Sequence, residues 1–488
     1  MAPPNIRTNW LWYALGLLLF AVAIRWQTFG NPLLHQDEDF YLFVGGRILK
    51  GDLPFVDIWD RKPIGLFLLY SFFHLFGPWR VLAYQIGALL SLWGTSLLVI
   101  RIASFIAPFG GALLAGFMYE AWPSIAGGEG GQAPIFYNLL VASAMALIIC
   151  RLQRLSDKNT LRSTGTVVML LFGIALQIKY TVLFEGIFAG IFLLWTGWHT
   201  NKSIKELSIN AFLWITSALL PTATVFLFYI LKGHGYDWYF ANILSIFYRG
   251  HYPSTILKQY AFNAFLLTAP LLVCRLIRKP MGITFSKSQQ NYAYFLDLWL
   301  IVAIFGVVLF EPWNKHYTLP LFAPLAIAAA PIWRNYWGKI GLLLLLASVA
   351  IKGEIFTYKH IKTHGDKQDL MQIKAAIRDP KGCVFIYNEL ISLYDMLPYC
   401  KLTTHPFPTH FNYLMEERAT NINPVQEIHH ILDQKPEYIV ISDPFFTKGV
   451  SIEEVYSILS NDIRYNYTPI YKYYFNNNKN VKKKKKTP

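Results

Sequence analysis

The sequence has little charge and few cysteines for its length. Only 15% of its 488 residues are Asp, Glu, Lys or Arg, and four are cysteine. An average soluble domain is about 25% charged. Here 54% of the residues are hydrophobic and the mean hydropathy is +0.33. The shortage of charge therefore excludes an ordinary soluble enzyme and indicates a chain that lies largely in lipid.

Three other signals are missing. No glycine-rich loop of the kind that cradles a nucleotide phosphate occurs. No internal repeat of the kind common in transporters is evident. The first apolar run, residues 10–24, leads into Arg25 without the small residues of a cleavage site, which predicts an uncleaved first span.

Basic residues outnumber acidic ones by 44 to 29, which gives a net charge of +15. No basic face with interleaved aromatic residues lies outside the apolar part, so a nucleic-acid partner is not expected. Five consecutive lysines, 482–486, fall in a tail over residues 476–488 that is expected to be disordered. The alternative for this tail is adhesion to anionic lipid.

Eleven apolar runs are predicted to cross the membrane as helices, since about 20 residues at about 1.5 Å each span a core of about 30 Å. They lie near residues 10–25, 79–100, 105–122, 133–150, 165–179, 181–198, 208–231, 259–277, 293–310, 318–333 and 339–352. Arg7 precedes the first run, and basic residues gather in the loops after the fourth, sixth, eighth and tenth. These loops and the N-terminus are therefore predicted to face the cytoplasm.

The composition changes after residue 352. Short β-like runs alternate with helical stretches over residues 353–475, which predicts a small α/β domain outside the membrane, after a transmembrane domain over 1–352. Cys383 and Cys400 begin two of the β-like runs, in a compartment that permits disulfides. Two alternatives are open: a disulfide bond between Cys383 and Cys400, or two free thiols at these positions.

The first outer loop, residues 26–78, is unusually polar. It contains Gln36-Asp37-Glu38-Asp39 and Asp60-Arg61-Lys62-Pro63. Charged groups beside a bilayer are costly unless they handle an ion, a phosphate or a reaction. The stretches 40–50 and 62–77 are predicted to be short interfacial helices that flank a pocket.

This residue set suits transfer of a sugar from a lipid phosphate to a hydroxyl. Such a reaction needs a carboxylate to accept the hydroxyl proton and a cation to hold the departing phosphate. Asp37 and Glu38 can supply the first. The candidates for the second are Lys62, Lys179, Lys315 and His316.

Several segments carry a resemblance to a known family. The stretches 36–41, 51–57 and 60–63 resemble the first outer loop of the GT-C superfamily, and more narrowly the bacterial protein O-mannosyltransferase and lipid A aminoarabinose transferase group. That group has Asp-Glu after the first span, a Gly-x-x-Pro-Tyr turn and a Lys-Pro-Pro sequence. This chain has Phe55 for the tyrosine and Ile64 for the second proline.

Two later segments are also similar to this group. They are Gln177-Ile178-Lys179-Tyr180 and residues 314–321, which resemble the His-Tyr-x-Leu-Pro motif of the family. The resemblance extends over about residues 10–335 and is dense only in the segments named. The outer C-terminal domain is of the kind that many members carry.

The resemblance implies a GT-C fold, a polyprenyl-phosphate-linked sugar as donor, and inversion at the anomeric carbon. It places the catalytic acidic residue at Asp37, with Glu38 beside it, and phosphate-binding residues at Lys62, Lys179 and His316. Outer-loop acids hold a divalent cation in some members, so Asp37, Glu38 and Asp39 are candidate ligands, although no spacing demands a metal. It also implies a bacterial inner membrane, with the active site and the C-terminal domain facing the periplasm.

Other residues are candidates for contact with donor or acceptor: Tyr41, Arg61, Glu129, Tyr317 and Arg249. Simpler roles stay open. Asp37, Glu38 and Asp39 would also suit the positive end of a helix, and Lys62 would also suit a side chain that reaches up to lipid headgroups. Glu129 lies in a glycine-rich loop where solvation alone is an equal alternative, and Glu185 lies within a predicted span.

Two other functions compete with glycosyl transfer. A transporter or flippase for a lipid-linked saccharide would move substrate without covalent transfer, and a structural scaffold would use the outer domain only for binding. The polar residues at one face and the soluble domain favour the enzyme. The acceptor is left open among lipid, glycan and protein hydroxyls.

Overall fold

The computed structural model describes residues 10–377, 380, 382–442, 446–474 and 482–487. Its chain divides into two compact units. Unit 1 contains Met1–Gln27, Gln85–Val225 and Lys258–Thr357, and unit 2 contains Thr28–Tyr84, Phe226–Leu257 and Tyr358–Pro488. The first outer loop thus belongs to the same unit as the C-terminal domain, whereas the sequence places it with the transmembrane domain over 1–352.

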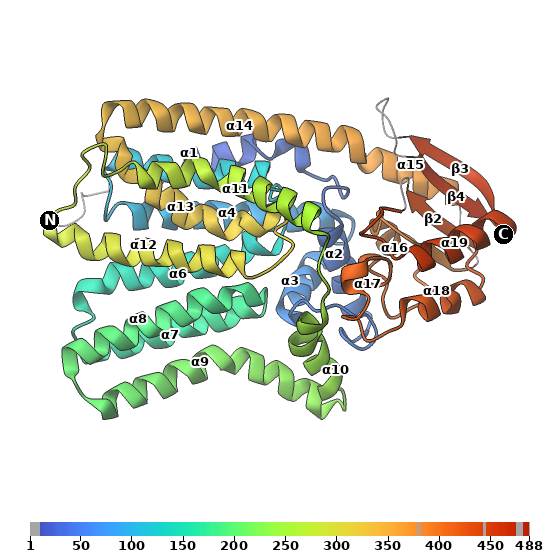
Figure 1. The fold of residues 1–488 in the computed structure, drawn as a ribbon, viewed down its shortest axis with the longest axis horizontal. Coiled ribbons are helices and arrows are strands. Elements are labelled where there is room, and N and C mark those ends of the chain that lie inside the picture. The colour runs from blue at the N-terminus through green and yellow to red at the C-terminus, as the bar shows by residue number, and fades with distance from the viewer. Residues whose placement is uncertain (1–9, 378–379, 381, 443–445, 475–481, 488) are drawn as a thin grey trace. The chain divides into compact units, whose positions relative to one another are not determined.

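Unit 1 is helical (Figure 1). Helices that are neighbours in the sequence pack on one another: α6 packs on α7, and α7 packs on α8. Helix α12 also packs on α8. Helices satisfy their own backbone groups, which is what an apolar chain in lipid requires. The helices are α1 (Trp10–Ala23), α4 (Arg80–Ala103), α5 (Phe109–Ala121), α6 (Ala133–Arg151), α7 (Lys158–Leu176), α8 (Leu183–Asn201), α9 (Ile204–Leu231), α11 (Ser254–Leu276), α12 (Lys287–Val308), α13 (Phe322–Ala329) and α14 (Tyr336–His364).

Within the described residues, eight helices are long and apolar enough to cross a membrane. The predicted count of eleven is not confirmed, because three of the eleven runs form shorter helices. Two of these, α1 and α5, have 14 and 13 residues. The third run, 318–333, is divided among η9 (Lys315–Leu321), α13 and η10 (Ala330–Arg334), where Pro320 and Pro331 interrupt the helical pattern.

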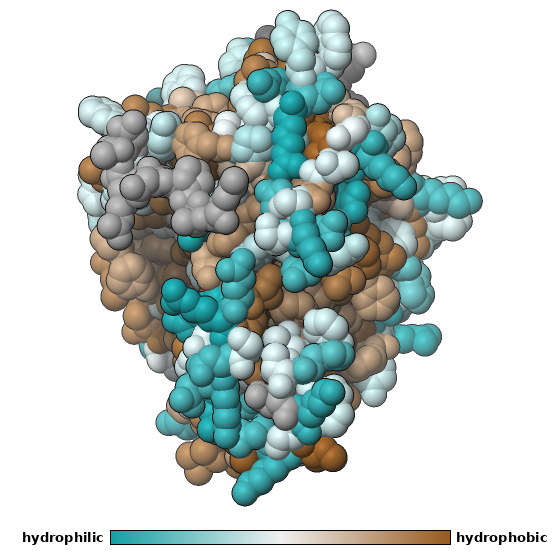
Figure 2. Space-filling model, turned by 90° about the vertical axis from the view of Figure 1, so that its left-hand side faces the viewer, coloured by the Kyte–Doolittle hydropathy of each residue, from teal (hydrophilic) through white to brown (hydrophobic). Residues whose placement is uncertain are grey.

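The basic loops of unit 1 share one end of the helices. The turns from α6 to α7 and from α8 to α9 lie together with the start of α12 (Figure 1). Figure 2 faces this end and shows hydrophilic side chains gathered across it. Glu206 pairs with Lys158 at 2.6 Å and with Arg162 at 2.7 Å, and Asp297 pairs with Arg275 at 2.5 Å. Charges that were predicted to face the cytoplasm therefore lie on one side of unit 1.

Unit 2 begins with two paired helices, α2 (Gln36–Ile48) and α3 (Ile64–His74). Both agree with the short helices that the sequence predicts. They approach closely at Gly45, where a Cβ atom would lie 2.6 Å from the Ser71 nitrogen. The Ser71 hydroxyl donates to the Gly45 carbonyl at 3.0 Å, and Tyr41 packs edge-on against Tyr70 with ring centroids 5.3 Å apart.

The rest of unit 2 surrounds a small mixed sheet (Figure 1). The strand order is β1-β2-β4-β3, with β1 parallel to β2 and β4 antiparallel to both of its neighbours. The hydrophobic core includes Phe385, Ile439, Ile428 and Leu459. The elements are α10 (Gly235–Tyr239), η7 (Phe240–Leu244), η8 (Ser245–Tyr248), α15 (Lys367–Ile377), β1 (Val384–Ile386), α16 (Ser392–Met396), α17 (Thr409–Asn412), η11 (Leu414–Glu416), α18 (Pro424–Asp433), β2 (Tyr438–Ser442), α19 (Glu453–Asn466), β3 (Thr468–Tyr474) and β4 (Lys482–Thr487).

Strand β4 contains the lysine run. The sequence predicts a disordered tail here, but Lys482–Thr487 pairs with β2 on one side and with β3 on the other. Strand pairing uses backbone groups, so a run of identical polar residues does not prevent it. Residues 476–481 and 488 of the expected tail lie outside the described residues.

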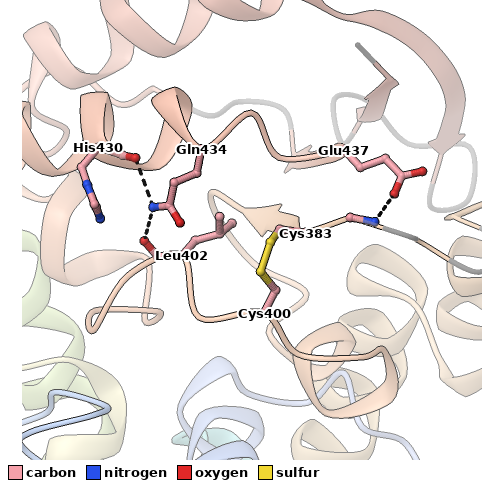
Figure 3. The surroundings of a disulfide bond; sticks show 7 residues. Cys383, Cys400, Leu402, His430, Gln434 and Glu437 are labelled. Carbon is pink, nitrogen blue, oxygen red and sulfur yellow. Dashed lines mark hydrogen bonds between the residues drawn. A yellow bond between two sulfur atoms is a disulfide. The ribbon is translucent and has the colours of Figure 1, made fainter.

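A disulfide joins Cys383 to Cys400 (Figure 3). Cys383 immediately precedes β1, and the two Cα atoms are 5.3 Å apart. The β-like run after Cys400 forms a loop instead of a strand. In this loop the Leu402 carbonyl accepts a hydrogen bond from Gln434 Nε2 at 2.9 Å, which ties the loop to the end of α18.

Candidate functional site

The first turn of α2 carries three consecutive carboxylates, Asp37, Glu38 and Asp39. Acidic side chains are favourable at this positive end of a helix. Burial separates them, because Glu38 and Asp39 are buried while 24% of the Asp37 side chain is exposed. Asp37 is therefore the most accessible of the three to a substrate.

Lys62 lies beside Asp37. Its Nζ is 3.4 Å from Asp37 Oδ1 and 3.4 Å from Asp60 Oδ2. Asp60 Oδ1 accepts the backbone N–H groups of Arg61 at 2.6 Å and of Lys62 at 3.0 Å, which fixes the turn before α3. Burial lowers the pKa of Lys62, but Asp60 and Asp37 outweigh it, so the net pKa is raised and the ammonium stays charged.

Two aromatic rings complete the surroundings of Lys62. Its Nζ is 5.1 Å from the centroid of the Tyr41 ring and 5.4 Å from that of the Phe407 ring. A cation over an aromatic face is stabilised by the ring quadrupole. Tyr41, which the sequence proposes as a substrate contact, therefore lies against the predicted phosphate-binding lysine.

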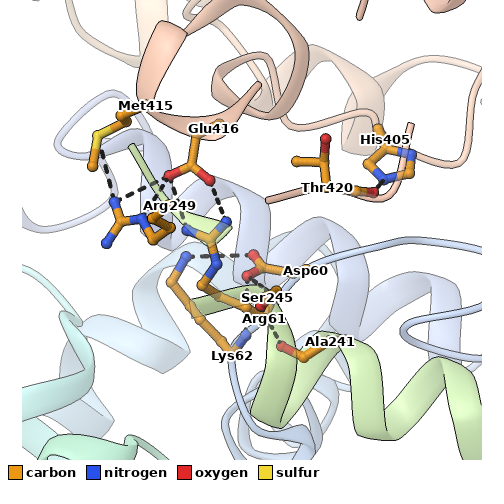
Figure 4. Close-up of polar contacts among 10 residues, drawn as sticks. All are labelled: Asp60, Arg61, Lys62, Ala241, Ser245, Arg249, His405, Met415, Glu416 and Thr420. Carbon is orange, nitrogen blue, oxygen red and sulfur yellow. Dashed lines mark hydrogen bonds and ion pairs between the residues drawn. The ribbon is translucent and has the colours of Figure 1, made fainter. Parts of the chain in front are cut away.

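A buried carboxylate bridges two arginines next to this pair (Figure 4). Glu416 Oε1 accepts from Arg61 Nη1 at 2.8 Å and from Arg249 Nε at 3.1 Å, and Glu416 Oε2 pairs with Arg61 Nη2. Burial raises the pKa of Glu416, but the two guanidinium groups outweigh it and hold the pKa at about 2. Glu416 is thus a permanent anion that joins the first outer loop, the 226–257 segment and the C-terminal domain.

Histidines of the C-terminal domain enclose Trp59, just before this turn. His405 stacks on the Trp59 ring at 5.1 Å and His410 meets it edge-on at 4.7 Å. Burial lowers the pKa of His405 to about 4 and that of His410 well below its usual range, so both rings are neutral at pH 7. The backbone N–H of Trp59 donates to the Thr404 carbonyl at 2.7 Å, which further fixes the turn that carries Lys62.

Asp39 points away from Asp37. Its Oδ2 accepts a hydrogen bond from the Ser392 hydroxyl at 2.7 Å, and burial raises its pKa well above the usual value. Asp37 instead faces Lys62. No group of three or more His, Cys, Asp or Glu side chains that could hold a metal occurs within the part of the chain that the structure describes. The three carboxylates of α2 are therefore not gathered around one point in this structure, and a divalent cation held by them stays a prediction.

Unit 1 brings together the other predicted phosphate-binding residues. The Lys179 ammonium lies 4.8 Å from the centroid of the Tyr317 ring, and the His316 ring packs edge-on against Tyr317 at 4.8 Å. Lys315 Nζ lies 5.6 Å from the Phe356 ring. The lysine between α7 and α8 and the His-Tyr motif of η9, which are far apart in sequence, are thus neighbours.

The glycine-rich loop of unit 1, residues 127–131, is bound by a buried arginine. Arg25 donates to the carbonyls of Gly128, Glu129 and Gly130 at 2.5, 3.0 and 3.2 Å. Both Arg25 and Glu129 are buried. Within the same unit Glu185 accepts a hydrogen bond from Trp299 Nε1 at 2.6 Å.

No known protein-family profile matches the chain, and no curated protein matches it. Among solved structures, ArnT from Cupriavidus metallidurans in the apo state matches with a TM-score of 0.63 and 13% identity over 98% of each chain. The same protein bound to undecaprenyl phosphate matches with a TM-score of 0.64 and 11% identity, again over 98% of each chain. The GT-C fold predicted from the sequence is thereby confirmed, with its helical membrane part and its small α/β domain.

Proposed function

We propose that this protein is an inverting membrane glycosyltransferase that moves a hexosyl or pentosyl group from a polyprenyl-phosphate donor to a lipid, glycan or protein hydroxyl. The observation that carries the proposal is the pair of Asp37 and Lys62, a partly exposed carboxylate 3.4 Å from a charged ammonium. The fold supports it, because the solved structure of ArnT that this chain is similar to is bound to undecaprenyl phosphate.

In the proposed reaction, Asp37 accepts the proton of the acceptor hydroxyl as its oxygen attacks the anomeric carbon. The bond from that carbon to the phosphate oxygen breaks, and the polyprenyl phosphate leaves with the bonding electrons. Lys62 stabilises the negative charge that develops on the leaving phosphate. Its raised pKa keeps it protonated throughout. Glu38, buried beside Asp37, is proposed to assist it.

The other site residues are proposed to hold substrates. Lys179, Lys315 and His316 are assigned to the donor phosphate. Contacts with donor or acceptor are assigned to Tyr41, Arg61, Glu129, Tyr317 and Arg249. The proposal also places the protein in a bacterial inner membrane with this site facing the periplasm.

The test compares cells that express the wild-type chain, Asp37→Asn, and the control Asp52→Asn at matched levels. Asp52 lies on the same outer loop and pairs with Arg47 at 2.6 Å, away from Lys62. Mass spectrometry of total lipids, surface glycans and envelope proteins is expected to show one acceptor with an added sugar mass. This added mass should be present in cells with the wild-type chain or Asp52→Asn and absent from cells with Asp37→Asn. If cells with a correctly inserted Asp37→Asn protein show no difference from wild type, the mechanism is wrong. A flipping assay for a lipid-linked saccharide is then the next experiment.

A further inference from the structure

Unit 1 contains an apolar groove between α11 and α14, beside η10. Its volume is about 630 Å³, within the range of about 300–1,000 Å³ that small-molecule sites occupy. Val273 and Ile277 line it on one side, and Gly341 and Leu345 line it on the other. No charged side chain is among the described residues that line it. The groove therefore suits an apolar chain.

Two glycines of α14 line the groove for different reasons. Gly338 is buried, and a Cβ atom there would collide with the Ile332 carbonyl oxygen, so close packing requires this glycine. A Cβ atom at Gly341 would meet no described atom within 4 Å. Glycine inside a helix is destabilising relative to alanine, and packing of the described residues does not require it at this position. The space along Gly341 is therefore open to a molecule that is not part of the chain.

The two helices that form the groove are candidate spans with little of their surface covered by protein. In the most apolar part of each span, 6% is buried for α11 and 22% for the span that begins with α14. The stretches 269–277 and 337–345 each rise by about 12 Å at about 1.5 Å per residue. One leaflet has a hydrocarbon depth of about 15 Å, half of a core of about 30 Å. The length of the groove thus suits one acyl chain of one leaflet.

One end of the groove lies at the level of the basic turns of unit 1. The loop from α11 to α12 and the start of α14 are both at the end that carries these turns (Figure 1). Tyr336 and Trp337, the first residues of α14, are 68% and 72% exposed. Exposed aromatic residues at the end of a span are typical of headgroup level. The groove therefore extends from the headgroups into the leaflet.

The basic residues at this end differ in their partners. Arg278 is buried and pairs with Asp297 at 3.3 Å, so its charge is used within the protein. Lys279 and Lys339 are exposed, and neither forms an ion pair within the part of the chain that the structure describes. Lys339 Nζ lies 5.9 Å from the centroid of the Trp333 ring. Two positive charges at the end of the groove are thus left for a ligand.

No acidic residue near these lysines in the sequence competes for them. Residues 258–296 and 312–353 contain neither Asp nor Glu. Lys279 lies between the lining residues Ile277 and Met281, and Lys339 follows the lining residue Gly338. Basic pockets between membrane helices bind anionic lipid headgroups. The charge at this end of the groove is therefore complementary to a lipid phosphate.

We propose that this groove binds one anionic phospholipid, with an acyl chain along Gly341 and the phosphate between Lys279 and Lys339. The proposal does not rest on the proposed function. Helix α7 begins at the basic turn and ends just before Lys179. A polyprenyl-phosphate donor held at Lys179 would therefore have its phosphate at the other end of unit 1.

Native mass spectrometry of the full chain tests the proposal, because it counts bound lipids. The protein is purified in detergent, freed of lipid, and titrated with phosphatidylglycerol or with phosphatidylcholine of the same acyl chains. Wild type is expected to bind one phosphatidylglycerol several-fold more tightly than phosphatidylcholine. Gly341→Phe, which fills the groove, is expected to weaken this binding several-fold. Gly16→Phe is the matched control, because a Cβ atom at Gly16 on α1 also meets no described atom within 4 Å.

A second pair of variants keeps the test independent of the folding of Gly341→Phe. The double variant Lys279→Gln with Lys339→Gln leaves the groove open and removes the proposed phosphate ligands. It is expected to lose the preference for phosphatidylglycerol. The control is Arg154→Gln with Lys205→Gln, which removes the same charge from exposed positions on η5 (Leu152–Arg154) and α9 at the same end of unit 1.

Four results would overturn the proposal. One is equal binding of phosphatidylglycerol by wild type and by Gly341→Phe, and another is a preference that survives the double lysine variant. Displacement of phosphatidylglycerol by an equal amount of undecaprenyl phosphate would assign the groove to a polyprenyl chain instead. A wild-type dimer without bound lipid that Gly341→Phe converts to a monomer would assign it to a second copy of this chain.

Discussion

Each unit contains a buried charged side chain, and the two are stabilised by different means. In unit 1 the buried Arg25 donates to three backbone carbonyls, and Glu185 accepts from an indole N–H. In unit 2 the buried Glu416 is satisfied by two full positive charges, those of Arg61 and Arg249. Dipoles keep their polarity at any pH, whereas ion pairs depend on protonation. The comparison predicts that the Glu416 cluster of unit 2 is more sensitive to charge removal and to acid than the Arg25 cluster of unit 1.

The largest effect is expected from Glu416→Ala. It would leave two arginines beside an empty buried position, and removal of one partner from a buried ion pair costs about 3–5 kcal/mol. Thermal unfolding of the purified protein would measure this loss. Glu417→Ala is the control, since Glu417 is the adjacent exposed residue and should change little. Equal stability of the two variants would show that the bridge contributes nothing.

Acid sharpens the same comparison. Burial raises the pKa of Glu416, but Arg61 and Arg249 bring it to about 2, below the value of about 4.3 in an unfolded chain. A carboxylate whose pKa is lower in the folded than in the unfolded chain stabilises the fold at pH values above its unfolded pKa. For Glu416 this contribution is lost as the pH falls from about 4.3 towards 2. Unfolding measured over that window should show a steeper loss for wild type than for Glu416→Gln. Parallel curves for the two proteins would contradict the assignment.

A smaller effect is expected in unit 1 from Arg25→Met. The variant keeps an unbranched side chain but loses the hydrogen bonds to the 128–130 loop, at a cost of about 2–3 kcal/mol. This loss should be the same at about pH 4.3 and at about pH 2, whereas the contribution of Glu416 in unit 2 is lost between those two values. Thermal unfolding at the two pH values would test both points, with the exposed Lys205→Met as the matched control.

The smallest effect is expected from Lys401→Ala. Its Nζ pairs with Asp57 Oδ1 at 2.7 Å, but both side chains are more than a third exposed. Exposed pairs contribute at most about 1 kcal/mol and are screened by salt. A loss as large as that of Glu416→Ala in the same unfolding assay would show that burial does not explain the difference between the two pairs.

Sequence reasoning succeeded where the signal was local. Pro63 and Gly77 bracket α3 in the sequence, and the acidic turn at Asp37 marks the start of α2. Sequence reasoning also proposed Lys179 and the His-Tyr motif for one site, and the structure places Lys179 against Tyr317. Their catalytic and binding roles stay predictions.

Sequence reasoning failed where partners are remote. Glu416 lies 355 residues from Arg61, and nothing near Glu416 in the sequence indicates that pair. The same remoteness separates the first outer loop from its partners in the sequence, since contacts such as that of the Trp59 backbone N–H with the Thr404 carbonyl join this loop to the rest of unit 2. The count of eleven spans is not confirmed, and for the run 318–333 the reason is local, because proline residues divide a stretch that hydropathy alone treats as continuous.

Gly45 has a consequence for the ancestry of such chains. The pairs Gly45–Ser71 and Asp37–Lys62 show that α2 and α3 run side by side from the same end. A Cβ at position 45 would meet the backbone of α3, so any larger residue would push the two helices apart and widen the gap between the carboxylate and the ammonium. Selection for the proposed chemistry at Asp37 and Lys62 would then also act on the size of the side chain at position 45, two helical turns away. A distant relative that had lost this glycine would be expected to have lost the proposed reaction as well.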